Sequence, residues 1–271
     1  MRYDMIELRD AKVFFRYGGQ RCRPAIVFLH GFVCSSHMFA RLMEKLEEDY
    51  YVIALDLPGF GQSDSPDVDV FDYSYQHLAE IAEEFLIRLK LDRFYLYVAD
   101  LGASIGYRIA LRHPDWILGV ISQGVDIYDR SIEISERKIS PQGIFLSYIA
   151  GEDPRAIAPD SYMLSVHYAL RPNFKKIYLA LMQELKKEKE EAYPRFLRYL
   201  LDYQPKMLLA WGLYDPEASC AASGIYQKDV EDCTLCLLNG GHFPLEAHLQ
   251  EIYDAVVLFC QEESAKQKYL A

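Results

Sequence analysis

Strand-type and helix-type hydrophobic patterns alternate along most of this chain. Short runs dominated by apolar residues, as in strands buried on both faces, occupy 25–29, 51–55, 94–98, 116–122, 207–211 and 233–238. Segments with helical periodicity follow most of them, at 37–47, 74–90, 102–112, after Pro216 and at 245–260. Two alternating segments, 3–8 and 13–17, open the chain as an antiparallel pair. This order predicts an α/β protein with a mostly parallel, eight-stranded sheet, right-handed crossovers and flanking helices.

The alternation stops between about 126 and 204, where the chain keeps a helical pattern and holds eight tyrosines. We interpret 126–204 as a helical cap inserted into a core whose two parts are 1–125 and 205–271. Within the cap, the charged residues at 186–191 predict a solvated helix face.

Composition agrees with a folded protein and narrows the expected partners. Hydrophobic residues make up 51% of the chain and charged residues 25%, which is ordinary for a globular protein. The net charge is −11 and no long basic block is present, which disfavours nucleic acid as a binding partner. No apolar run approaches the ~18–20 residues that span a bilayer. Six scattered cysteines indicate reduced thiols. We therefore expect a cytoplasmic monomer or homodimer with a small-molecule substrate and no membrane or nucleic-acid partner.

Candidate chemistry is concentrated in four loops at the carboxyl ends of predicted strands, where parallel sheets collect their ligands. These loops contain His30-Gly31-Phe32, the turn at Asp100, Trp211-Gly212-Leu213-Tyr214-Asp215 and Gly241-His242. An acid at a strand end, a later acid and a final histidine follow the chain order nucleophile, acid, base. Asp100, Asp215 and His242 are therefore the candidate catalytic residues.

Together these motifs resemble the α/β-hydrolase superfamily, in particular the branch with an aspartate nucleophile that includes epoxide hydrolases and haloalkane dehalogenases. The resemblance covers nearly the whole chain and includes the segment DLPGFGQSD at 56–64. It implies that Asp100 is the nucleophile and that the backbone N–H groups of Phe32 and Leu101 form an oxyanion hole. It implies no metal or organic cofactor.

A carboxylate nucleophile restricts the substrate by its chemistry. Attack on an ester carbonyl would give a reactive anhydride, so the productive targets are saturated carbons with a leaving group, such as epoxides and alkyl halides. The product of attack by Asp100 is an alkyl-enzyme ester. His242 would activate the water that hydrolyses this ester, and Asp215 would orient the imidazole.

Three alternatives remain open at this stage. Residues 102–106 match the G-x-S-x-G pattern of serine carboxylesterases, which makes Ser104 an alternative nucleophile, although it lies one turn into the predicted helix and not on the turn before it. Asp126 follows another predicted strand and is an alternative acid. The third alternative is a catalytically silent hydrolase-like protein that binds a ligand between cap and core.

The sequence departs from the dehalogenase pattern at several positions. Leu101 stands where haloalkane dehalogenases place a halide-binding tryptophan, and Phe32 stands where they place asparagine. Both tryptophans, Trp116 and Trp211, fall in predicted strands. Haloacid dehalogenases of the fluoroacetate type carry arginines near the nucleophile, but Arg108 lies two turns into the helix and is expected to pack or form an ion pair. Haloalkane or haloacid dehalogenation is therefore the less favoured chemistry.

Epoxide opening is favoured by the tyrosines of the predicted cap. Epoxide hydrolases protonate the opening oxygen with phenols that project from the cap. Tyr162 and Tyr168 are the candidates here, because they fall in one cap segment. Val33 is a departure, because many epoxide hydrolases have proline at this position.

Overall fold

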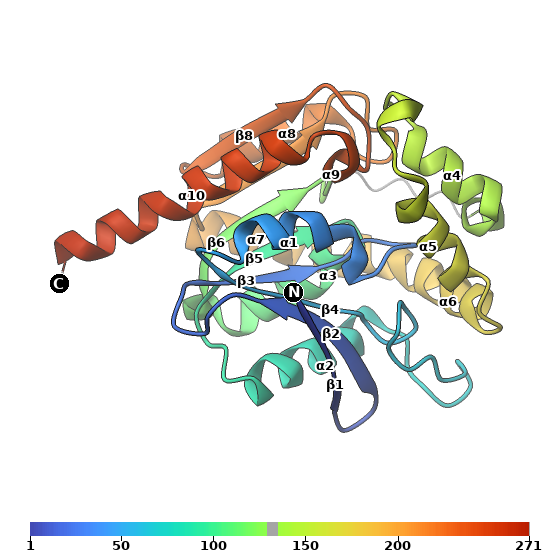
Figure 1. Cartoon of the computed structure of the whole chain (residues 1–271). Helices are drawn as coiled ribbons and strands as arrows, with labels where there is room; N and C mark the ends of the chain where they lie inside the picture. The colour runs from blue at the N-terminus through green and yellow to red at the C-terminus, as the bar shows by residue number, and fades with distance from the viewer. Residues whose placement is uncertain (129–134, 271) are drawn as a thin grey trace.

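The computed structural model describes residues 1–128 and 135–270, with side chains described up to Gln261. Its centre is an eight-stranded sheet in the order β1-β2-β4-β3-β5-β6-β7-β8 (Figure 1). The strands are β1 (Arg2–Glu7), β2 (Lys12–Gly18), β3 (Ala25–Leu29), β4 (Tyr51–Leu55), β5 (Phe94–Ala99), β6 (Ile117–Gln123), β7 (Met207–Gly212) and β8 (Cys233–Leu238). β1 and β2 pair antiparallel, β2 also pairs antiparallel with β4, and every other pairing is parallel. The predicted fold class is confirmed.

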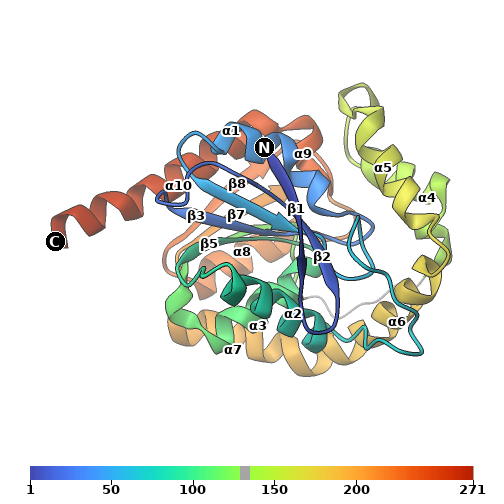
Figure 2. The ribbon, with the colours of Figure 1, turned by 60° about the horizontal axis from the view of Figure 1, so that its bottom comes forward.

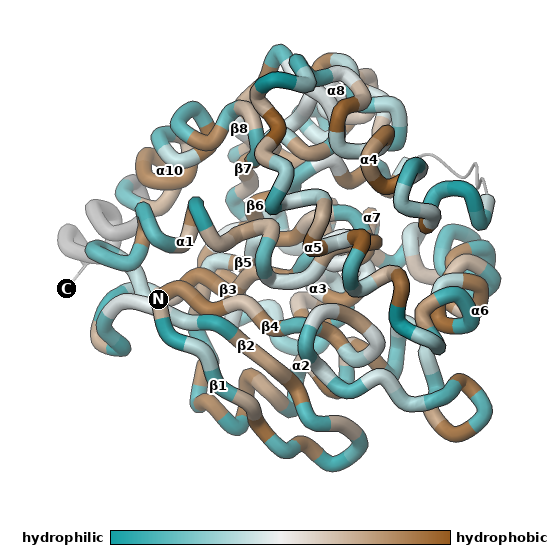
Figure 3. Tube along the Cα trace, turned by 45° about the vertical axis from the view of Figure 1, so that its right-hand side comes forward, coloured by the Kyte–Doolittle hydropathy of each residue, from teal (hydrophilic) through white to brown (hydrophobic). Residues whose placement is uncertain are grey.

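Helices cover both faces of the sheet (Figure 2). They are α1 (Ala40–Leu46), α2 (Tyr75–Arg88), α3 (Leu101–Arg112), α4 (Pro141–Ile149), α5 (Pro159–Ala169), α6 (Phe174–Lys187), α7 (Tyr193–Tyr203), α8 (Cys220–Asp229), α9 (Pro244–Ala247) and α10 (Leu249–Leu270). α1 and α10 pack together on one face, and α2 and α3 pack together on the other. Figure 3 shows apolar residues along the central strands β3 and β5, which are buried throughout. Continuous apolar runs therefore predict the central strands because both of their faces are covered.

The predicted strands coincide with the observed strands or differ from them by one residue at one or both ends, and one residue lies in a different kind of element. Trp116 lies not in a strand but in the short 3-10 helix Pro114–Trp116 that precedes β6. Its ring stacks on His113 at a centroid distance of 3.8 Å. Pro114 fixes its own backbone for a helical turn, so the strand begins only at Ile117.

Residues 136–203 of the segment between β6 and β7 are mostly helical, from the 3-10 helix η3 (Glu136–Ile139) to α7. We call residues 135–203 the insertion. In Figure 2, α4, α5 and α6 stand beside the sheet, whereas α7 runs next to α3. Phe196 of α7 stacks on Tyr107 of α3 at 5.4 Å. The end of the insertion is therefore packed directly on the helix that follows Asp100.

The close approach of α3 to the sheet depends on a glycine. A Cβ at Gly102 would lie 2.2 Å from the carbonyl oxygen of Leu29. Because only glycine fits this contact, α3 can begin directly over the end of β3. This contact sets the position of the turn that carries Asp100.

Candidate active site

Asp100 occupies a strained turn between β5 and α3. Its backbone has φ 43° and ψ −116°, a conformation that costs roughly 1–3 kcal/mol for a residue with a side chain. Although Asp100 is the N-cap residue of α3, its side chain makes no capping hydrogen bond. Strain without a capping bond indicates that this position holds the carboxylate away from the helix and over the carboxyl end of the sheet.

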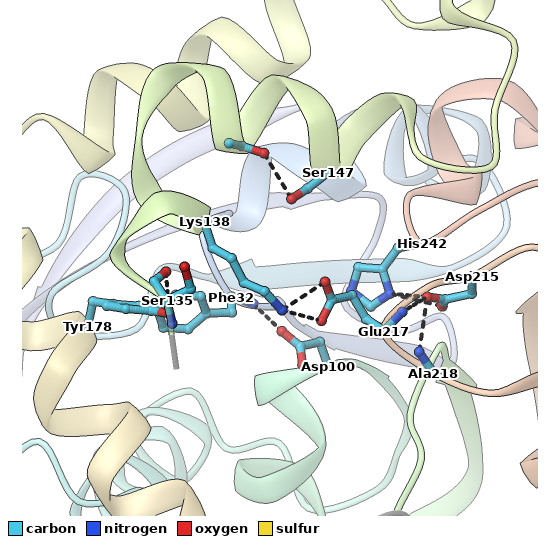
Figure 4. Close-up of polar contacts among 11 residues, drawn as sticks. Phe32, Asp100, Ser135, Lys138, Ser147, Tyr178, Asp215, Glu217, Ala218 and His242 are labelled. Atoms are coloured by element: carbon cyan, nitrogen blue, oxygen red, sulfur yellow. Dashed lines mark hydrogen bonds and ion pairs between the residues drawn. The ribbon is translucent and has the colours of Figure 1, made fainter. Parts of the chain in front are cut away.

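The carboxylate of Asp100 is held by the loop after β3. The backbone N–H of Phe32 donates to its Oδ2 at 2.7 Å (Figure 4). A Cβ at Gly31 would lie 3.1 Å from the Cβ of Asp100, so the loop comes close to Asp100 at the one position where it has no side chain. Leu101 is the first residue of α3, and its N–H has no acceptor within the helix. The two N–H groups predicted as an oxyanion hole thus belong to the segments on either side of this carboxylate.

His242 and Asp215 form a pair on the neighbouring loops, with side chains that are 13% and 1% exposed. Nδ1 of His242 lies 2.9 Å from Oδ2 of Asp215 and 3.1 Å from Oδ1. Oδ1 also accepts hydrogen bonds from the backbone N–H groups of Glu217 and Ala218, at 2.8 and 3.1 Å (Figure 4). These bonds fix the orientation of the carboxylate, which in turn fixes the imidazole.

The electrostatics of this pair favour a charged imidazole. Burial by itself lowers the pKa of His242, but the negative charge of Asp215 and its hydrogen bond, with a further contribution from Asp100, raise that pKa to about 9. Asp126, the alternative acid, does not contact the imidazole Nδ1 through a hydrogen bond among the described residues. Its Oδ1 accepts a hydrogen bond from the N–H of Tyr128 at 2.9 Å. The imidazole Nδ1 is therefore paired with Asp215, as the chain order predicts.

Gly124 brings the end of β6 against this pair. It has φ +57°, and a Cβ there would lie 3.0 Å from Oδ2 of Asp215 and 3.4 Å from Nδ1 of His242. Any larger residue would be strained and would also press on the hydrogen bond between the two side chains.

Asp100 and His242 open into one cavity of about 270 Å³. The core contributes these residues together with Phe32, Gly124, Val125, Asp126, Pro216 and Glu217, and the insertion contributes Lys138, Tyr178, Met182, Leu185, Lys189 and Tyr193. The ammonium of Lys138 forms an ion pair with Glu217 at 2.8 Å, next to Asp100 and His242 in Figure 4. The cavity therefore lies between the carboxyl end of the sheet and the insertion.

The tyrosines of this cavity are not those selected from the sequence. Tyr162 packs against Phe145 and Tyr148, and Tyr168 lies near His37; neither of the two lines the cavity. Tyr178 and Tyr193 line it instead. Single-sequence patterns identify the insertion helices but do not fix their rotation about their axes, and this rotation decides which phenols point inward.

Tyr178 and Tyr193 differ in the partners of their hydroxyl groups. The Tyr178 hydroxyl donates to the carbonyl of Ser135 at 3.0 Å and accepts from its N–H at 3.2 Å. Burial raises the pKa of Tyr193, the charges of Asp100 and Glu188 raise it further, and a hydrogen bond with Ser104 lowers it. The Tyr193 phenol is thus protonated and close enough to Asp100 to feel its charge.

Tyr193 follows a π-helical turn (Glu188–Ala192) that joins α6 to α7. This turn falls in the charged segment predicted to be a solvated face, and there the prediction is wrong for one residue, because Glu188 is only 4% exposed. Its carboxylate forms a two-pronged ion pair with Arg108 of α3, with Nη2 2.6 Å from Oε2. A charge pattern along one segment cannot reveal a partner that lies 80 residues away in sequence.

Ser104 does not share the position of Asp100. It is buried within α3, one turn after the strained residue, and it does not line the cavity. The two tryptophans are also outside the cavity; Trp211 is buried and donates its Nε1–H to the carbonyl of Ala218 at 3.1 Å. Among the described residues, no group of three or more His, Cys, Asp or Glu side chains could hold a metal ion.

Comparisons with known proteins fit this geometry. The family model described as alpha/beta hydrolase fold matches residues 24–248. The chain belongs to this family. The hydrolase is 30% identical to an uncharacterized hydrolase of Saccharomyces cerevisiae, over 94% of its own chain and 96% of that protein. It is also 35% identical to a fluoroacetate dehalogenase of Burkholderia, over 43% of this chain and 38% of the other.

Solved structures give the same fold. A loop variant of a haloalkane dehalogenase from Bradyrhizobium elkanii superposes with a TM-score of 0.82 at 19% identity, covering 100% of this chain and 99% of that one. A shorter match, found by sequence and not by structure, is to epoxide hydrolase 3 of Xenopus tropicalis. It is 27% identical over 44% of this chain and 33% of that protein. The chain is thus a hydrolase of the α/β fold with dehalogenase and epoxide hydrolase relatives. Within the described residues, no helix is long and apolar enough to cross a membrane.

Proposed function

We propose that this hydrolase opens small electrophiles, epoxides in preference to alkyl halides, through an ester on Asp100. The observation that carries the proposal is the strained turn that presents the Asp100 carboxylate to a cavity shared with the His242–Asp215 pair. A serine at position 104 has neither this turn nor access to the cavity, so the esterase alternative has no comparable support.

In the first step, Oδ1 of Asp100 attacks a saturated carbon of the substrate. The N–H of Phe32 holds Oδ2, which leaves the other oxygen for attack. A C–O bond forms between carbon and Oδ1 as the carbon–oxygen bond of the epoxide breaks, and its electron pair goes to the epoxide oxygen. Tyr193 and Tyr178 both line this cavity, so either side chain is placed to donate the proton that this oxygen requires. Tyr178 can do so only when its hydrogen bond to the carbonyl of Ser135 breaks, so Tyr193 is the primary donor in this proposal.

In the second step, water hydrolyses the ester. Esterification removes the negative charge of Asp100, which is one of the charges that raise the pKa of His242. Esterification therefore lowers the pKa of His242 and shifts the imidazole towards its neutral form at the stage at which a base is needed to take a proton from water. The oxyanion that forms on the former carboxylate carbon is stabilised by the N–H groups of Phe32 and Leu101. On collapse, the bond between the carboxyl carbon and Oδ1 breaks, and the leaving alkoxide takes the proton from the imidazolium of His242. The new carboxyl group of Asp100 gives its proton back to the phenolate formed in the first step, so the diol is released and the carboxylate is restored with one oxygen from water.

The cavity favours an epoxide over a halide. The two side chains with which haloalkane dehalogenases bind the departing halide are replaced here by the hydrocarbon side chains of Leu101 and Phe32, and neither tryptophan lines the cavity. An opening epoxide needs an acid, and the cavity offers two phenols. The insertion, which supplies both tyrosines, is in this proposal the described part of a cap that spans residues 126–204 between the two parts of the core.

Isotope labelling tests the ester route. Excess enzyme is incubated with styrene oxide in ¹⁸O-labelled water for one turnover, digested and analysed by mass spectrometry. We expect one ¹⁸O in the peptide that contains Asp100 and none in the diol. His242→Gln should accumulate the ester as an enzyme heavier by one substrate, and Ser104→Ala should label as the wild type does. Label in the diol but not in Asp100 would refute the proposal, and turnover of 1-bromobutane but not of the epoxide would reassign it to dehalogenation.

A further inference from the structure

A second groove lies between the core and the insertion, separate from the candidate catalytic cavity. Its volume is about 620 Å³, and it has no lining residue in common with that cavity. Residues of α1, α5 and α9 form its walls, and Figure 3 shows α1 and α5 on the same face of the molecule. The steps proposed for the hydrolase do not use this groove.

Arg16 of β2 opens into this groove with most of its hydrogen-bonding capacity unused. The side chain is buried, with the residue only 9% exposed. Nε donates to the hydroxyl of Ser36 at 2.8 Å, and the guanidinium lies over the ring of Tyr3 at 5.6 Å. Among the described residues, its Nη groups donate to no acceptor and its charge has no ion-pair partner within 4 Å. Four N–H donors of a buried cation are therefore left to the groove.

The carboxylate with the strongest influence on Arg16 is already engaged elsewhere. Burial lowers the pKa of Arg16, and the charge of Asp56 opposes this effect without a direct contact. Oδ1 of Asp56 accepts from the N–H of Ser36 at 2.7 Å, and Oδ2 accepts from the N–H of Gln62 at 2.8 Å. A guanidinium remains charged in proteins, and a buried charge without a paired counter-ion is costly. An anion in the groove would remove this cost.

The other residues of the groove narrow the chemistry of that anion. Met38, Leu164 and Leu245 line it, so a hydrocarbon chain would be sheltered next to the charged head. Glu246 and Asp160 line it too, and Oε2 of Glu246 accepts a hydrogen bond from Ser161 at 2.6 Å. Arg41 and Arg155 line the groove as well, so with Arg16 it holds three arginines against these two carboxylates, and the resulting net charge of +1 favours a singly charged ligand over a doubly charged phosphate.

We propose that this groove binds a monocarboxylate with a short hydrocarbon tail, whose carboxylate pairs with Arg16 while the tail lies along Leu164 and Leu245. The planar fork of a guanidinium matches a carboxylate with two parallel hydrogen bonds. The ligand contacts both the core and the insertion, so it stabilises their packing and raises the melting temperature of the protein as its concentration rises.

Calorimetric titration with octanoate tests the site, with octan-1-ol and inorganic phosphate as comparison ligands. We expect octanoate to bind more tightly than both, because octanol has no charge and phosphate has no tail. Arg16→Gln should weaken octanoate binding by about 10- to 100-fold, the loss that charge-assisted hydrogen bonds produce. Arg9→Gln, which removes an exposed arginine outside the groove, should leave the affinity unchanged.

Two further variants separate this groove from the catalytic cavity and from a folding defect. Leu164→Trp fills the groove while keeping Arg16, and it should abolish octanoate binding even if Arg16→Gln does not fold. Asp100→Asn should bind octanoate as the wild type does. The proposal is overturned if the wild type binds no octanoate, if Leu164→Trp or a folded Arg16→Gln binds it normally, if Asp100→Asn changes its affinity, or if octanol or phosphate binds as tightly. Octanoate binding to the groove does not depend on whether Asp100 forms an ester, so the two proposals can fail separately.

Discussion

Replacing Glu188 or Arg108 tests how the insertion is fixed to the helix that carries Asp100. The side chains of Arg108 and Glu188 are 14% and 4% exposed, so removal of one leaves the other charge buried. Breaking such a pair from one side costs about 3–5 kcal/mol of unfolding free energy. The two single variants differ in the contacts that remain to stabilise the charge left behind.

After Glu188→Gln, Arg108 keeps three other contacts. Nη1 donates to the carbonyl of Ser104 at 2.9 Å, Nε donates to Gln76 at 3.3 Å, and the guanidinium lies 5.4 Å from the ring centre of Phe196. We therefore expect a loss near the lower end, about 3 kcal/mol. Arg108→Met leaves the more deeply buried carboxylate without its cation, and we expect a loss near the upper end, about 5 kcal/mol.

Urea unfolding at neutral pH measures both losses, provided that the dependence on urea concentration stays the same. The double variant Arg108→Met/Glu188→Met should recover most of the stability lost by Arg108→Met, because no buried charge remains. The matched control is Arg198→Gln, which breaks an exposed pair with Asp202 and should change stability by less than about 1 kcal/mol. Additive losses in the double variant would refute this reasoning.

The same variants report on catalysis, because Tyr193 directly follows the π-helical turn that Glu188 anchors. In folded Glu188→Gln we expect kcat for an epoxide to fall while KM changes little, since the phenol of Tyr193 loses its fixed position in the cavity that it shares with Asp100. A kcat equal to that of the wild type, together with a large loss in Tyr193→Phe, would show that the ion pair stabilises the fold without positioning the phenol.

Three further predictions follow from the site. Tyr193→Phe should lower kcat for epoxide opening by about 10²-fold, the lower end of the range for general acids because Tyr178 remains, and steady-state kinetics with Tyr199→Phe as control checks this. Gly124→Ala should destabilise the protein by roughly 1–3 kcal/mol in urea unfolding and lower kcat, because its φ is +57° and a Cβ would press on Asp215; unchanged kcat would contradict it. The pKa of His242 is raised from 6.5 to about 9 on folding, so its contribution of about 3 kcal/mol is full below pH 6.5 and disappears as pH rises through 9. Unfolding free energies of wild type and His242→Gln should therefore converge between these pH values, and a constant difference would count against the raised pKa.

Local sequence patterns predict the sheet and the loops that carry the candidate chemistry. The runs at 25–29 and 51–55 coincide with β3 and β4, because strands buried on both faces must be apolar at every position. The carboxyl ends of parallel strands lie at one edge, so chain order alone brings the loops of Asp100, Asp215 and His242 to the same edge of the sheet. Neither conclusion requires knowledge of how distant helices pack.

Contacts between residues far apart in sequence decided which side chains line the cavities and which are buried. Tyr193 and not Tyr168 lines the cavity, Glu188 is buried within a charged segment, and Arg16 opens into a groove made by three separate parts of the chain. An amphipathic segment specifies that a helix has an apolar side, but the contacts that select its rotation come from residues far away in sequence. The sequence by itself therefore determines the sheet and the order of the catalytic candidates, whereas the lining of both cavities exists only once the insertion has docked on the core.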